Sequence, residues 1–138
     1  MASVIYDSFA YDLSRGLING ATDTYYLLLT LGYTPNKKTQ TKRSDVTGEV
    51  TGVGYTLGGN PTAATLVNDT VNDKTTWTFT AVSWPSSTIS ASGGVIYKRR
   101  GGAATADELV AFVDFSATIT STAATFTATF STPLTIQN

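Results

Sequence analysis

Threonine alternates with apolar residues in two segments of this chain, and this alternation constrains the fold more than any other feature. The run TWTFTA occupies residues 76–81, and TFTATF occupies residues 125–130. Because successive side chains of a β-strand point to opposite faces, each run predicts a strand with one hydroxyl face and one apolar face. With 26 threonines in 138 residues, the chain is expected to form sheets whose faces carry little charge.

Short strand-like segments separated by turn residues continue along the rest of the chain. Strands are expected at 23–31, 48–56, 62–68, 75–82, 87–98, 108–115, 117–120, 123–131 and 133–137, with breaks at Gly58-Gly59-Asn60-Pro61 and at Trp84-Pro85-Ser86. Gly93-Gly94 inside a strand pattern predicts a bulge or corner. Eight or nine short strands without a second helix are typical of a sandwich, jelly roll or small barrel. We therefore predict an all-β fold, a jelly roll or β-sandwich, in one domain over residues 1–138.

The N-terminal segment carries the only helical pattern. Ile5, Phe9 and Leu13 follow one another at intervals of four residues, and Gly16 is a suitable C-terminal stop, so a helix is predicted over residues 3–15. An extended arm over residues 1–20 is the alternative. The tail at 133–138 is apolar enough to reach a neighbouring molecule, as is the N-terminus, although both can equally pack on their own sandwich.

This chain lacks two residue types that many catalytic sites use. It contains no histidine and no cysteine, on which common nucleophile–base and metal-ligand sites depend. Asp107 and Glu108 would point to opposite faces in a strand and are expected to be solvated if they lie in a loop. Asp114 and Glu49 form a carboxylate pair only if their strands place them together. The segment 68–73 is rich in Asn and Asp and predicts a turn rather than a calcium loop. We predict no enzymatic activity, no cofactor and no metal site.

The two tryptophans have different expected places. Trp77 follows the inward alternation and is expected in the core, whereas Trp84 stands beside Pro85 in a predicted turn, where it could be exposed. An exposed indole can stack on a sugar ring. A carbohydrate- or receptor-binding β-sandwich, such as a tail-fibre or adhesin module, is therefore the alternative function.

Charge is sparse and nearly balanced, which bounds the classes of partner. The formal net charge is −1, whereas a dedicated nucleic-acid binder normally carries a basic excess. No apolar run approaches the roughly 20 residues that a membrane-spanning helix needs. We therefore expect no direct nucleic-acid partner and no membrane partner.

Seven of the nine basic residues form two clusters. One lies in a long predicted loop and comprises Lys37, Lys38, Lys42 and Arg43; the other, residues 98–100, ends a strand. The loop cluster either is solvated or meets an acidic patch of a protein partner. The cluster at 98–100 is interpreted as a solvated strand end.

The order of segments along most of the chain resembles a known group of phage head proteins. The segments are YDSFAYDLSRG, TDTYYLLL, YTPNKKTQTKRSDVTGEV, GYTLGG, VIYKRRGG and DELVAFVDF. They resemble the capsid cement, or decoration, proteins of tailed phages, in particular the jelly-roll type found on a short-tailed Bordetella phage. None of these segments is a mechanistic motif, so the likeness rests on pattern and order.

This resemblance implies a virion structural protein. Its expected place is the exterior of the capsid, after assembly in the host cytoplasm, and its expected partners are the major capsid protein and a second copy of itself in a homodimer. The loop that contains residues 42–45 matches the group's pattern best. The candidate contacts are Lys37, Lys38, Lys42, Arg43 and Asp45.

Overall fold

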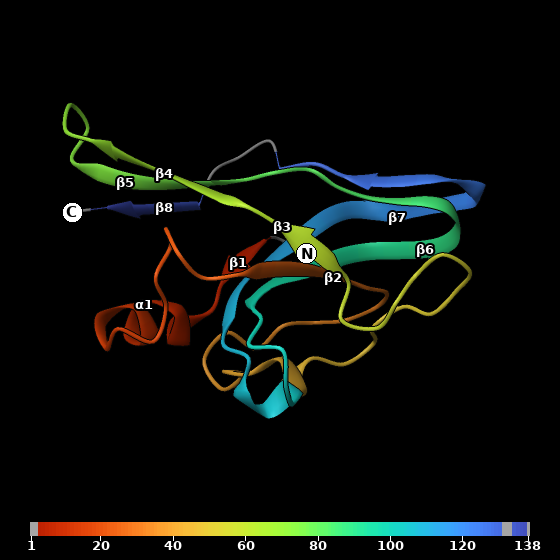
Figure 1. The fold of residues 1–138 in the computed structure, drawn as a ribbon, viewed down its shortest axis with the longest axis horizontal. Coiled ribbons are helices and arrows are strands. Elements are labelled where there is room, and N and C mark those ends of the chain that lie inside the picture. Colours follow the sequence, from red (N-terminus) through yellow and green to blue (C-terminus); the bar gives the residue numbers. More distant parts are fainter. Residues whose placement is uncertain (1–2, 131–133, 138) are drawn as a thin grey trace.

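The computed structural model describes residues 3–130 and 134–137 and consists mainly of two antiparallel β-sheets. Its elements are β1 (Val4–Ile5), α1 (Asp7–Ser14), β2 (Tyr25–Thr30), η1 (Arg43–Asp45), β3 (Asn60–Thr62), β4 (Ala64–Asp69), β5 (Lys74–Phe79), β6 (Val82–Lys98), η2 (Ala104–Ala106), β7 (Leu109–Ala128) and β8 (Leu134–Gln137). One sheet has the order β1-β7-β6-β2-β3, and the other has the order β4-β5-β8 (Figure 1). The predicted all-β sandwich of about eight strands is confirmed.

The long pair β6–β7 connects the two layers. Both strands bend sharply together, so that one part of each lies with the larger sheet and the other part lies level with β5 and β8 (Figure 1). At the bend, Ser86 and Ala123 have φ angles of 50° and 46°. The predicted break at residues 84–86 is therefore wrong, because the chain bends there and continues its pairing, with register shifts between Trp84 and Ser87 and between Ser87 and Ile89. The strands predicted separately at 108–115, 117–120 and 123–131 correspond to one bent strand, β7, which spans 109–128.

Buried hydroxyl groups hold this bend, which we call the hydroxyl corner (Ser87, Ser121 and the backbone around them). Ser87 Oγ lies 2.8 Å from the carbonyl oxygen of Trp84 and 2.9 Å from Ser121 Oγ. Ser121 Oγ in turn donates to the carbonyl oxygen of Ser87 at 3.0 Å. Register shifts free backbone groups from the ladder, and small hydroxyl side chains supply them with partners. A further shift between Ala91 and Gly93 confirms the predicted bulge.

Two predicted elements differ from the structure. The expected strand 48–56 is a loop attached to its neighbours by two isolated bridges, one from Glu49 to Thr30 and one from Val53 to Thr88. Glycines with positive φ interrupt it, because a regular strand requires negative φ throughout. The predicted helix at 3–15 begins only at Asp7, since Val4–Ile5 pairs with β7 instead. Among the described residues, no helix is long and apolar enough to cross a bilayer.

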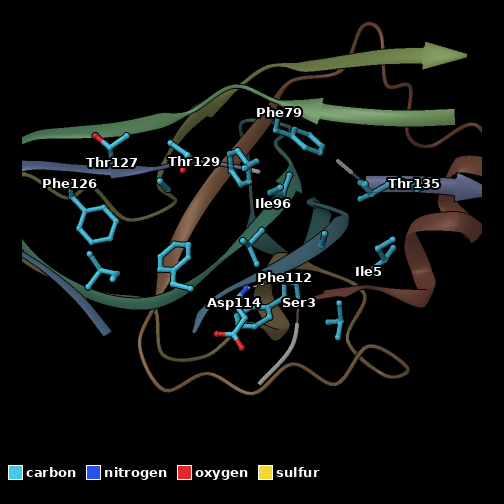
Figure 2. A pocket seen from close by; sticks show the side chains of 18 residues that line it. Ser3, Ile5, Phe79, Ile96, Phe112, Asp114, Phe126, Thr127, Thr129 and Thr135 are labelled. Carbon is cyan, nitrogen blue, oxygen red and sulfur yellow. Dashed lines mark hydrogen bonds between the residues drawn. The ribbon is translucent and has the colours of Figure 1, made fainter. Parts of the chain in front are cut away.

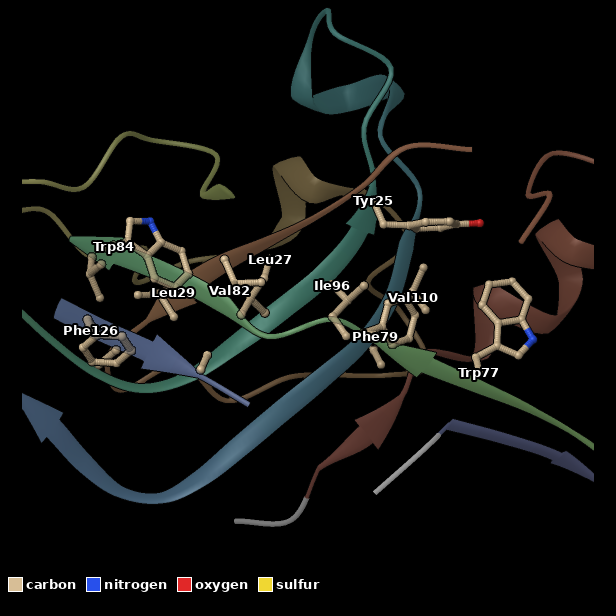
Figure 3. Close-up of a cluster of buried hydrophobic side chains, with 14 of the residues drawn as sticks. Tyr25, Leu27, Leu29, Trp77, Phe79, Val82, Trp84, Ile96, Val110 and Phe126 are labelled. Atoms are coloured by element: carbon tan, nitrogen blue, oxygen red, sulfur yellow. The ribbon is translucent and has the colours of Figure 1, made fainter. Parts of the chain in front are cut away.

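Aromatic side chains fill the space between the sheets (Figure 3). Trp77 is 1% exposed, which confirms its predicted place in the core, and its ring centroid lies 5.1 Å from that of Phe9. Trp84 is also only 1% exposed and packs against Phe126. The expected exposure of Trp84 is therefore wrong, because Trp84 continues the alternation of β6, in which Val82 is buried and Ser83 is exposed.

Candidate functional site

The two basic clusters of the sequence meet at one end of the molecule, beside the connection between β6 and β7. The loop approaches the start of β7 through its backbone: Arg43 N donates to the carbonyl oxygen of Asp107 at 2.8 Å, and Leu109 N donates to that of Thr41 at 3.2 Å. The charged residues gathered there are Lys42, Arg43, Lys98, Arg99, Arg100, Asp107 and Glu108, and we call them the charged end.

Two carboxylates are buried at the centre of the charged end. The Asp107 side chain is 1% exposed and accepts hydrogen bonds from Arg43 Nε at 2.8 Å and from Arg100 N at 2.9 Å. The Glu108 side chain is 2% exposed, accepts from Arg100 Nη2 at 2.5 Å and lies 3.6 Å from Lys42 Nζ. The expectation that both are solvated in a loop is wrong, because the loop at 41–43 covers them.

These contacts perturb the ionisation of Glu108. Burial alone would raise the pKa of its carboxyl group, because a low-dielectric environment disfavours the charged form. The hydrogen bonds from Arg100 and the charges of Lys42 and Arg100 outweigh burial and hold the pKa below its ordinary value. Glu108 is thus a structural anion: it joins the residue before β7 to Lys42 of the loop and to Arg100, which follows β6.

The outer residues of the predicted loop site are arranged differently. Lys37 Nζ lies 3.6 Å from Asp7 Oδ1, and both side chains are about half exposed. Lys38 is exposed. Asp45 Oδ2 accepts the backbone N–H groups of Thr41 and Lys42 at 2.9 and 3.0 Å, which closes the loop. The structure therefore brings Lys42 and Arg43 to the charged end and leaves Lys37 and Lys38 on the outside of the same loop.

The interpretation of residues 98–100 as a solvated strand end also needs correction. Lys98 Nζ lies 3.0 Å from Asp23 Oδ2, and its side chain is 12% exposed. Arg100 is paired with Glu108 as described. The sequence did not reveal that these cations have carboxylate partners with little exposure, because that burial depends on the fold.

An apolar groove of about 680 Å³ opens between the sheets, on the side where β1 and β8 form the edges (Figure 2). Phenylalanine rings are prominent in its wall, at positions 79, 112, 115, 126 and 130. Its mouth includes Ile5 and Ile119, which are 39% and 45% exposed. At its rim, Asp114 N donates to Ser3 Oγ at 2.8 Å.

The candidate carboxylate pair is not assembled. Glu49 bridges to Thr30, Thr30 pairs with Gly93, and Gly93 pairs with Asp114. Three strand spacings therefore separate Glu49 from Asp114, roughly 14 Å at about 4.8 Å per strand. That separation exceeds the upper limit of about 9.5 Å for the two carboxyl groups of a glycosidase.

The acidic turn after β4 behaves as a turn. Asp69 Oδ1 accepts the backbone N–H groups of Val71 and Asn72, both at 3.1 Å, and Asp69 Oδ2 accepts Asn72 Nδ2 at 2.8 Å. The hydrogen bonds from Asn72 lower the pKa of Asp69 most. Within residues 3–130 and 134–137, no group of three Asp or Glu side chains is placed to hold a metal ion.

Comparison with known protein families, with curated proteins and with solved structures finds no match to this chain.

Proposed function

We propose that this protein is a virion structural protein, a cement protein that binds the outer surface of a phage capsid shell and stabilises it without catalysis. The order of segments described above carries this proposal. An ordered loop that exposes Lys37 and Lys38 supports it, because a binding surface needs shape and charge, not a reaction centre.

The loop at 36–45 is the proposed contact because it is exposed and yet fixed in shape. Gln40 Oε1 accepts from Tyr33 Oη at 2.6 Å and from Asn36 N at 2.8 Å, while Asp45 closes the other side of the loop. A loop that is already ordered loses less conformational entropy when it binds. Lys37 and Lys38 then present their charges to an acidic surface of the shell.

Copy number strengthens such a contact. A shell repeats the same binding surface by symmetry, so even a weak contact at each position adds up over the particle. A homodimer that touches two capsid subunits gains further, since the second contact forms at a high effective concentration. We therefore propose the major capsid protein and a second copy of this chain as partners, on the virion exterior.

Shell binding is the direct test. Empty shells of the capsid protein encoded in the same genome are mixed with this protein, sedimented, and heated with and without it. We expect co-sedimentation and a higher disruption temperature. Absence of both would contradict the proposal.

The contact loop is tested separately with the double variant Lys37→Ala/Lys38→Ala. We expect shell binding about tenfold weaker with a shallower salt dependence, because exposed interfacial charges act over roughly one Debye length. The matched control is Lys74→Gln, which removes a cation from the three-stranded sheet and is expected to bind as the unchanged protein does.

The alternative, a carbohydrate- or receptor-binding module, predicts a different outcome. In that case a glycan array gives specific signals and the shells give none. Because Trp84 lies in the core, it supplies no stacking platform on the surface, which counts against this alternative.

A further inference from the structure

Two arginines of the charged end stack on two tyrosine rings. Tyr26 of β2 and Tyr97 of β6 are register partners, so their rings share one face of the sheet, with centroids 6.3 Å apart. The guanidinium carbon of Arg99 lies 4.4 Å from the Tyr26 centroid, and that of Arg43 lies 5.1 Å from the Tyr97 centroid. Each arginine is therefore held by an aromatic ring on the sheet.

Both guanidinium groups converge on the same point, Gly58. The position that a Cβ atom would take at Gly58 lies 3.1 Å from Arg99 Nη1, 3.3 Å from Tyr97 Oη and 3.9 Å from Arg43 Nη1. The backbone here is fixed, because Gly58 N donates to Glu49 Oε2 at 2.7 Å and Tyr97 Oη donates to the Gly58 carbonyl at 2.5 Å. A Cβ atom at residue 58 would be in tight contact with Arg99 Nη1 and Tyr97 Oη, so glycine lets both guanidinium groups pack close to the backbone here.

The five cations of the charged end differ in whether a carboxylate is paired with them. Lys42, Arg43, Lys98 and Arg100 each have a carboxylate within 4.0 Å. Within the described part of the chain, Arg99 forms no such ion pair, although its side chain is half-buried. A partly desolvated guanidinium is stabilised when an anion joins it.

We propose that Arg99 and Arg43 bind a carboxylate group of the protein partner, an Asp or Glu side chain or a chain terminus, beside Gly58. The identity of that partner as a capsid shell rests on the function proposed above. The guanidinium fork of Arg99 matches a carboxylate with two parallel hydrogen bonds, and stacking on Tyr26 orients the fork before the partner arrives.

A carboxylate fits this end better than a nucleic-acid backbone. Asp107, Glu108 and Asp23 lie among the cations, so the local excess of positive charge is small. A polyanion needs several neighbouring phosphate contacts and would meet these acids as well. A single carboxylate needs only the two neighbouring guanidinium groups of Arg99 and Arg43.

The first experiment uses small anions with the isolated protein. The arginine Nε–H signals are followed by NMR while sodium acetate, sodium phosphate or sodium chloride is added at constant ionic strength. We expect the Arg99 signal to shift saturably with acetate and not with chloride. Equal shifts with chloride, or a stronger response to phosphate than to acetate, would overturn the carboxylate assignment.

The second experiment measures shell binding by Arg99→Lys and Arg99→Ala, with Lys74→Gln as the charge-matched control. The backbone bond from Arg99 N to the Thr24 carbonyl at 2.8 Å needs no side chain, so both variants are expected to fold with little change in melting temperature. We expect binding about tenfold weaker for both variants, because lysine keeps the charge and loses the fork. Full binding by Arg99→Lys would overturn the proposal by reducing the site to a simple charge.

The two proposals fail in different ways. If the unchanged protein binds shells and Arg99→Ala binds equally well, the carboxylate site is wrong and the cement function stands. If the unchanged protein does not bind shells, the cement function is wrong, and the acetate titration alone decides whether Arg99 and Arg43 bind carboxylate beside Gly58.

Discussion

The long strand pair β6–β7 is held at its two ends by different chemistry. At the charged end, buried Asp107 and Glu108 are paired with arginine and lysine side chains from the loop and from the connection between the strands. At the hydroxyl corner, Ser87 and Ser121 bond to one another and to backbone carbonyls, and no charged group takes part in these contacts.

The difference shows how one fold can combine an end whose stability depends on pH and salt with an end whose stability does not. Ion pairs depend on pH and salt, whereas neutral hydrogen bonds between hydroxyl and carbonyl groups do not. The charged end also includes part of the loop and both arginines that we propose as partner contacts. Conditions that act on a protein contact there therefore also act on the stability of this end, while the bend that joins the two sheets is unaffected.

The largest expected effect comes from Asp107→Ala. It leaves Arg43 without its buried partner and removes the acceptor of Arg100 N, so we expect a loss of about 3–5 kcal/mol in the free energy of unfolding. Urea unfolding measures it. The control Asp7→Ala, in the exposed pair with Lys37, should cost less than about 1 kcal/mol. Equal losses in the two variants would mean that burial of the ion pairs at the charged end adds nothing to the free energy of unfolding.

A smaller effect is expected at the hydroxyl corner from Ser87→Ala. The change removes the hydroxyl group that bonds to the carbonyl oxygens of Trp84 and Ala124 and to Ser121 Oγ, at a cost of about 1–3 kcal/mol in unfolding free energy. Unlike the loss at the charged end, this loss should be the same at pH 4 and pH 8. Ser83→Ala is the matched control, because the Ser83 hydroxyl is exposed, 3.1 Å from that of Thr127, and should matter by less than about 0.5 kcal/mol.

The pH dependence should follow Glu108. Since its folded pKa is lowered from the ordinary 4.5, its contribution to stability is fully present above that value and is lost as pH falls through the folded pKa. Thermal unfolding between pH 7 and pH 2 should therefore show a decrease below pH 4.5 that Glu108→Gln makes shallower. An unchanged slope in that variant would assign the acid sensitivity to other carboxyl groups.

The smallest expected effect is a gain at the corner from Ala123→Gly. A non-glycine residue in the left-handed region costs roughly 1–2 kcal/mol, and glycine flexibility costs roughly 0.5–1 kcal/mol, so the net gain should be about 0.5–1 kcal/mol. Chemical denaturation would detect it. Ala117→Gly, at an exposed strand position without positive φ, should instead destabilise by about 0.5–1 kcal/mol, and the same sign in both variants would contradict strain at residue 123.

Local patterns predicted individual elements well where pairing and pattern agree. The threonine run at 76–81 predicted a strand at 75–82 and the core position of Trp77, and β5 ends close to that prediction, at Phe79. The segment 48–56 shows the limit of this approach. Its residues resemble a strand, but its glycines adopt positive φ and no continuous ladder forms.

Turn signals were less reliable where the fold continues a pair of strands through a bend. Trp84-Pro85-Ser86 carries the composition of a break, yet β6 and β7 stay paired on both sides of it because Ser87 and Ser121 compensate for the lost backbone bonds. No local signal identifies that compensation, since the two serines are 34 residues apart.

The sequence by itself determined that this chain forms sheets, because strand alternation is a property of neighbouring residues, and it limited the available chemistry through the missing histidine and cysteine. Only the tertiary structure decided that Asp107 and Glu108 are buried and that Arg43 and Arg99 converge on Gly58. Arg43 and Asp107 are separated by 64 positions. Contacts at that range depend on register and on bends, which no stretch of neighbouring residues encodes alone.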